Sequence, residues 1–186
     1  MKLSHFFHII LILSCLGVSH SLFGKKKKFQ ILKFEECSDY PNLNMRVIEF
    51  KNHAYSKKNR TMEVTLQVDK DITEDMWVTT NLWKCDLSGA PDTCEFYVKD
   101  LKIDKLCAKI PQKNQAWTSM VESFRPEFSC PLKKGKYASE PVIDETPFRF
   151  FPLPMGLWKT KAFIYEGDDK IFCLDFHAKI YEVREN

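Results

Sequence analysis

Cysteine is the residue type that most constrains what this chain can fold into. Of its seven cysteines, Cys15 lies within an apolar leader and six follow it. These six are Cys37, Cys85, Cys94, Cys107, Cys130 and Cys173. An even set in a chain that begins like a secreted protein predicts three disulfides, although the count alone leaves their pairing open. We expect these cysteines to tie parts of the chain together rather than to perform chemistry.

The first residues have the pattern of a signal peptide. Lys2 precedes an apolar run over residues 9–18, and Ser19 and Ser21 place small residues where cleavage requires them. The run is about half of the roughly 20 residues that a spanning helix needs, and no later segment approaches that length. We therefore expect residues 1–21 to be a signal peptide and residues 22–186 to form one secreted domain, a monomer without a membrane anchor.

Two further features concern the protein surface. Asn59 begins an Asn-Arg-Thr sequon, which predicts glycosylation of Asn59 if the chain is secreted. The formal net charge of +3 is too small to suggest a nucleic-acid partner. The only charge run, residues 25–28, consists of four lysines near the new N-terminus, where we expect a solvated, mobile tail.

Two segments alternate apolar and polar residues with the period of a half-buried β-strand. The first covers residues 62–68, and the second, residues 172–181, places Phe172, Leu174 and Phe176 on one side and Cys173 and Asp175 on the other. A turn at residues 167–169 predicts a hairpin that joins the second segment to a strand over residues 157–165.

The remaining elements favour an all-β fold. Shorter runs over residues 45–50, 77–84 and 94–98 fit strands, and turn signals separate them at the spacing typical of a sandwich. Trp117, Met120, Val121 and Phe124 recur at helical spacing, so residues 115–124 predict one short amphipathic helix that Pro126 stops. We expect an immunoglobulin-like sandwich of two sheets.

The sequence contains none of the familiar catalytic or metal-binding motifs. There is no Gly-x-Ser-x-Gly elbow, His-Glu-x-x-His pair or phosphate-binding glycine loop. His53 and His177 are far apart in sequence, so we interpret them as surface or hydrogen-bonded residues. Asp168 and Asp169 suit a tight turn. These observations predict a protein that is not an enzyme and that needs no metal or cofactor.

Aromatic side chains are abundant, above all around residues 147–158. On composition alone they could form a packed core or line a ligand cavity. Pro147, Pro152 and Pro154 prevent this stretch from forming a central strand. Apolar side chains held on such irregular backbone are candidates for a pocket mouth or for a lip that touches a membrane.

The order of these motifs resembles that of the MD-2-related lipid-recognition domains. The resemblance rests on the Cys-Pro-x-Lys-x-Gly-x-Tyr block at residues 130–137, the Pro-rich aromatic run after it, and Ile171-Phe172-Cys173. Phe34-Glu35-Glu36-Cys37 and the sequon agree in the N-terminal half, so the resemblance covers nearly all of the mature chain. Within the family the chain is most similar to the GM2-activator-like branch, and to the insect secreted chemosensory proteins of that branch.

This resemblance implies one particular disulfide pairing: Cys37 with Cys173, Cys85 with Cys94, and Cys107 with Cys130. By this analogy, the first pair would hold one side of the sandwich closed while the opposite edges of the sheets remain free to part. One difference limits the analogy. The GM2 activator has a fourth disulfide in the region between Cys107 and Cys130, where this chain has no cysteine. Specificity for glycolipids is therefore not carried over.

The resemblance also implies an apolar cavity between the sheets that takes a lipid or another apolar small molecule. Candidates for its lining come from the clearest strands and from the aromatic run. They are Val64, Leu66, Val68, Trp83, Phe148, Phe150, Leu153, Leu157, Trp158, Phe163, Phe172, Leu174 and Phe176. For each of these residues, packed core is as good an interpretation as ligand contact.

Three functions remain open from the sequence. The first is a secreted lipid carrier or modulator in chemosensory detection of pheromones, with a membrane surface, a receptor or a channel as its further partner. The second is an activator in the lysosomal lumen that presents a glycolipid to a hydrolase. The third is a secreted protein-interaction sandwich with a filled core.

Overall fold

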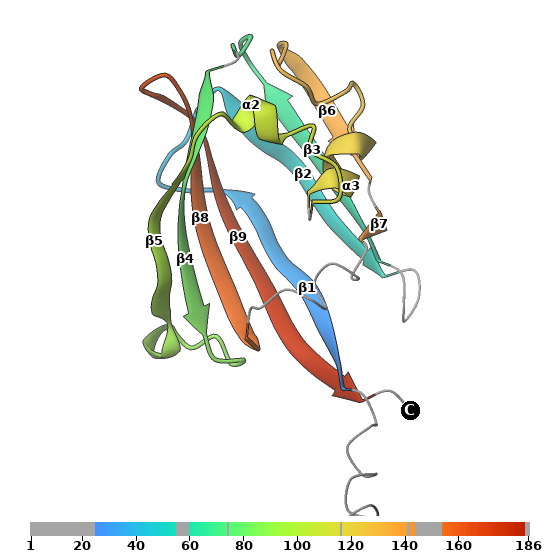
Figure 1. The fold of residues 1–186 in the computed structure, drawn as a ribbon, viewed down its shortest axis with the longest axis vertical. Coiled ribbons are helices and arrows are strands. Elements are labelled where there is room, and N and C mark those ends of the chain that lie inside the picture. Colours follow the sequence, from blue (N-terminus) through green and yellow to red (C-terminus); the bar gives the residue numbers. More distant parts are fainter. Residues whose placement is uncertain are drawn as a thin grey trace, which may run out of the picture.

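The computed structural model describes residues 25–54, 60–73, 75–115, 117–140, 142–143 and 154–184. These residues form an all-β sandwich of two antiparallel sheets, as the sequence predicts (Figure 1). The large sheet contains, in spatial order, β1 (Lys25–Glu36), β9 (Asp169–Arg184), β8 (Gly156–Glu166), β4 (Met76–Cys85) and β5 (Glu95–Ile103). The small sheet contains β2 (Met45–Ala54), β3 (Arg60–Val68) and β6 (Gly135–Ser139), with β7 (Val142–Ile143) paired to β3.

In the described part of the chain, the helices lie in connections between strands. A 3-10 turn, η1 (Pro91–Thr93), lies between β4 and β5, and α2 (Leu106–Lys109) and α3 (Thr118–Ser123) lie between β5 and β6. The predicted helix over residues 115–124 is α3. It is shorter than predicted because Phe124 already has extended backbone, and α2 is a second helix that the sequence did not indicate.

The two clearest strand predictions are confirmed. In β3, Val64, Leu66 and Val68 are buried, and β8 and β9 form a hairpin whose turn is at Gly167 and Asp168. Gly167 has a φ of 57°, in the left-handed region that glycine adopts without strain.

The tetralysine is a strand, not a mobile tail. Lys25 to Lys28 begin β1 and pair with the end of β9, where Lys28 lies opposite Tyr181. The same strand buries Ile31 and Phe34 and then shifts register between Ile31 and Lys33. This bulge breaks the period-2 pattern, so alternation alone does not identify β1.

All three disulfides join the predicted partners. The Cα–Cα distances are 5.4 Å for Cys37–Cys173, 4.0 Å for Cys85–Cys94 and 5.7 Å for Cys107–Cys130. The first bridge links the end of β1 to its neighbour β9, and therefore lies within the large sheet. The expectation that this bridge holds one side of the sandwich closed is therefore wrong, because β1 and β9 belong to the same sheet.

Hydrogen bonds between β1 and β2 close one side of the sandwich instead. Asn52 Nδ2 donates to the main-chain oxygen of Ile31 over 3.1 Å, and the amide of Val47 donates to Glu36 Oε1 over 2.9 Å. On the opposite side, β5 of the large sheet and β6 of the small sheet are joined by residues 104–134, which we call the cover segment.

Candidate apolar ligand site

An apolar cavity of about 330 Å³ lies between the two sheets and the cover segment. Seven of its lining residues come from strands: Phe34, Met45, Leu66, Ile103, Ile164, Phe172 and Leu174. Eight come from the cover segment: Leu106, Lys109, Ile110, Trp117, Met120, Val121, Phe124 and Phe128. Of these described lining residues, Lys109 alone is not apolar. The volume is roughly twice that of an engineered cavity of about 150 Å³ that binds benzene.

Strand geometry explains why the sheet residues reach this space. In β9, Phe172 and Leu174 are two residues apart and so point to the same face, and Ile164 of β8 lies opposite Phe172 on that face. Leu66 of β3 faces them from the small sheet and is buried. The inward faces of the two sheets therefore supply one half of the cavity wall.

The cover segment supplies the other half and is fixed at several points. The helices α2 and α3 are too short to be stable alone, so packing and cross-links must hold them. The Cys107–Cys130 bridge ties α2 to the stretch before β6. Arg125 and Ala138 exchange main-chain hydrogen bonds of 2.7 and 3.0 Å, which attach the end of the cover segment to β6.

Exposure increases toward one end of the cavity. Phe34, Met45, Phe124 and Phe172 are buried at its base. By contrast, Trp117 is 37% exposed. Leu106, Lys109 and Met120, which are partly buried, belong to the same cover segment. We therefore place the mouth of the cavity between α2 and the start of α3.

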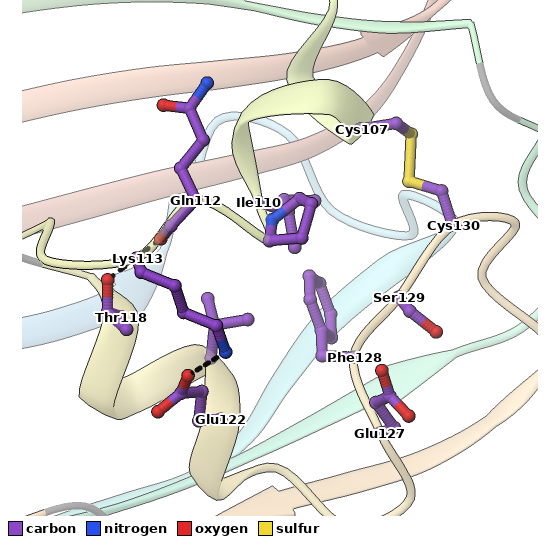
Figure 2. A pocket seen from close by; sticks show the side chains of 12 residues that line it. Cys107, Ile110, Gln112, Lys113, Thr118, Glu122, Glu127, Phe128, Ser129 and Cys130 are labelled. Carbon is purple, nitrogen blue, oxygen red and sulfur yellow. Dashed lines mark hydrogen bonds and ion pairs between the residues drawn. A yellow bond between two sulfur atoms is a disulfide. The ribbon is translucent and has the colours of Figure 1, made fainter.

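A second, smaller pocket of about 210 Å³ is lined entirely by residues of the cover segment (Figure 2). Its rim is polar: Lys113 pairs with Glu122, and Thr118 Oγ1 donates to the main-chain oxygen of Gln112 over 3.0 Å. Ile110, Val121 and Phe128 line both spaces. The two spaces are therefore neighbours that share these three apolar side chains.

The predicted lining residues are divided between the cavity, the core and the opposite face. Leu66, Phe172 and Leu174 line the cavity. Val64 and Val68 are buried in the core, and Phe176 contacts Phe34 with a centroid distance of 6.2 Å. Trp158 is buried away from the cavity, where its ring meets that of Tyr97 at 4.8 Å.

Three further candidates lie on the outer face of the large sheet. Phe163 pairs with Cys173, next to the inward Ile164, and its ring packs 5.1 Å from that of Tyr40. The rings of Trp83 and Phe96 pack with their centroids 4.8 Å apart. The side chain of Leu157 lies against Gly89, and a Cβ added to Gly89 would lie 2.5 Å from that side chain.

The remaining candidates fall outside the described residues. These are Phe148, Phe150 and Leu153 of the aromatic run. The sequon residue Asn59 and the leader, which includes Cys15, also lie outside the described residues.

Most of the described cavity lining differs from the candidates that the sequence suggests. The signal was present, because Trp117, Met120, Val121 and Phe124 mark the apolar face of a helix. That face had no assigned partner. The structure shows that its partner is the space between the sheets.

The described residues contain no group of three or more His, Cys, Asp or Glu side chains that could hold a metal ion. The two histidines of the predicted mature chain lie in different sheets, His53 in β2 and His177 in β9. In the described part of the chain, no helix is long and apolar enough to cross a membrane.

One polar cluster lies on the outer face of the large sheet. Asp175 accepts from Lys33 Nζ over 2.6 Å and lies 3.0 Å from His177 Nε2. Burial lowers the pKa of His177 below its ordinary value, and the Asp175 carboxylate opposes this shift only in part. The hydrogen bond to Asp175 raises the pKa of Lys33. These groups are on the opposite face from the cavity, so they do not contribute to it.

Comparison with known proteins assigns no family to the chain. No family model matches the sequence, and no curated protein matches it. Among solved structures, the chain is similar to a Niemann-Pick type C2 protein from Japanese carpenter ant, with a TM-score of 0.38 and 16% sequence identity. The match covers 78% of this chain and 97% of that chain. A likeness this weak does not indicate which ligand the chain binds or which family it belongs to.

Proposed function

We propose that this protein is a secreted, non-enzymatic carrier of a lipid or another apolar small molecule, of the MD-2-related lipid-recognition type. The observation that carries the proposal is the cavity of about 330 Å³, which both sheets and the cover segment line with apolar side chains. A preformed apolar space of this kind is the usual form of a small-molecule site. The motif order described above, from Cys37 to Cys173, supports the same family.

The binding step is desolvation of an aliphatic chain. Each buried CH₂ contributes about 0.8 kcal/mol, so about ten buried carbons would contribute roughly 8 kcal/mol before ordering costs. No bond needs to form or break. The open cavity favours a binding protein over an interaction module with a filled core.

We further propose that the carrier acts in chemosensory detection. This rests on the similarity to the insect secreted branch that the sequence motifs indicate. Measuring transcript and protein in sensory and other tissues tests it. Enrichment in sensory tissue is expected, and absence from that tissue would contradict the chemosensory role without affecting lipid binding.

A cavity-filling substitution tests the binding function directly. Leu174→Trp places a larger side chain in the cavity, whereas Leu87→Trp makes the same change at a side chain that is 44% exposed and does not line it. In a titration with an apolar fluorescent probe, we expect Leu174→Trp to weaken binding at least tenfold and Leu87→Trp to leave it unchanged. Thermal unfolding of both variants, followed by circular dichroism, confirms that each is folded. Equal probe binding by wild type and folded Leu174→Trp would contradict this site.

A further inference from the structure

We propose that the ligand carries a carboxylate at one end of its apolar chain, and that Lys109 at the cavity mouth binds this group. The inference rests on the proposed function and narrows it to a class of ligand, the anionic single-chain amphiphile. It begins from one observation: among the described residues that line the cavity, Lys109 is the only charged one.

The position of Lys109 suits an end group rather than a chain. It is the last residue of α2 and is partly buried, next to Trp117, whose indole Nε1 donates to the main-chain oxygen of Lys109 over 3.3 Å. A lysine in this setting lays its aliphatic stem along the apolar wall and keeps its ammonium in water at the rim. A ligand chain that fills the cavity would bring its polar end to the same rim.

The neighbouring charges leave Lys109 available. Lys102 pairs with Asp104 over 2.9 Å, and Lys113 pairs with Glu122. Within the described part of the chain, the ammonium of Lys109 has neither an ion pair nor a hydrogen bond. Lys105, one turn away, is exposed and does not line the cavity.

Charge decides which end groups this rim accepts. A carboxylate at the mouth gains an ion pair with Lys109 and stays in contact with water, so it avoids the cost of burying a charge. A primary alcohol of the same chain length gains only a neutral hydrogen bond, and a primary amine is repelled. Because the pair is near solvent, its effect is modest, and we expect about a three- to tenfold preference for the acid over the alcohol.

The test compares a saturated fatty acid with the primary alcohol of the same chain length. Each displaces the apolar fluorescent probe from wild type, Lys109→Met and Lys105→Met at neutral pH. We expect wild type and Lys105→Met to prefer the acid, and Lys109→Met to bind both ligands with the affinity that wild type shows for the alcohol. The preference should shrink in high salt and as the carboxyl group is protonated at low pH.

The possible outcomes separate this inference from the proposed function. If wild type binds acid and alcohol equally, or if Lys109→Met keeps the preference, the role of Lys109 is wrong while the carrier function stands. If wild type binds neither ligand nor the probe, both proposals are wrong.

Discussion

The indole of Trp117 is hydrogen-bonded to the main-chain oxygen of Lys109, and this bond joins the two helices at the cavity mouth. Nε1 of Trp117, at the start of α3, donates over 3.3 Å to the last residue of α2. Both residues also line the cavity. The side chain that forms part of the rim therefore also holds the rim together.

Trp117→Phe keeps an aromatic ring at the rim but removes this hydrogen bond. Because the bond is exposed, we expect a loss of about 0.5 kcal/mol or less in the free energy of unfolding. The larger effect should be kinetic, with release of the apolar probe about two- to fivefold faster because α2 and α3 separate more readily. Stopped-flow displacement measures this rate. An unchanged release rate would show that the bond does not control access to the cavity.

Removing the Cys107–Cys130 bridge should affect binding as well as stability. The bridge spans a sequence separation of 23 residues, for which the loop-entropy relation gives about 3.5 kcal/mol. It also fixes the cover segment, so Cys107→Ser with Cys130→Ser should weaken probe binding even under conditions where the variant is folded.

The Cys85–Cys94 bridge provides the matched control. It spans a separation of 9 residues, and neither cysteine lines the cavity. Replacing both with serine should lower the free energy of unfolding by about 2.5 kcal/mol while the folded protein keeps its affinity for the probe. Equal losses of affinity in the two double variants would mean that the first bridge acts only through global stability.

The partly buried His177 predicts a dependence of stability on pH. Burial lowers the pKa of His177 in the folded state from the ordinary value of 6.5. As the pH falls below 6.5, the unfolded chain binds a proton that the folded chain does not yet accept, so the free energy of unfolding decreases until the folded pKa is passed. Asp175, Lys33 and Lys159 are the charged groups that act on this histidine.

His177→Gln should make this decrease smaller, because glutamine takes up no proton in either state. Urea unfolding of wild type and the variant at several pH values between neutral and mildly acidic measures the slope. An identical slope in both proteins would show that another group is responsible.

Much of the sandwich can be predicted from the sequence, because the alternation of apolar and polar residues depends only on each strand's own residues. The alternation around Leu66 and Phe172 identifies strands and their buried faces without knowledge of the fold. Where a bulge interrupts the alternation, as between Ile31 and Lys33, the local signal is lost. The lysines at the start of β1 also have a low preference for strands. Pairing with β9 outweighs that weak preference.

The site was predicted only in part for a different reason. In β4 and β8, both faces carry apolar or aromatic side chains, so sequence could not decide whether Trp83 and Phe163 point inward. The structure places both on the outer face. The contribution of the cover segment depends on how a connection between two sheets folds back over the gap, and no pattern within residues 115–124 specifies that location.

Native mass spectrometry of the protein secreted from insect cells, followed by organic extraction, tests the central claim most directly. Wild type and Leu87→Trp should retain a co-purifying lipid or other apolar molecule that extraction recovers, or should take one up when it is supplied. Leu174→Trp should be folded and empty. A wild-type protein with no adduct and no uptake of fatty acids or long-chain hydrocarbons would contradict the assignment of this cavity as a ligand site.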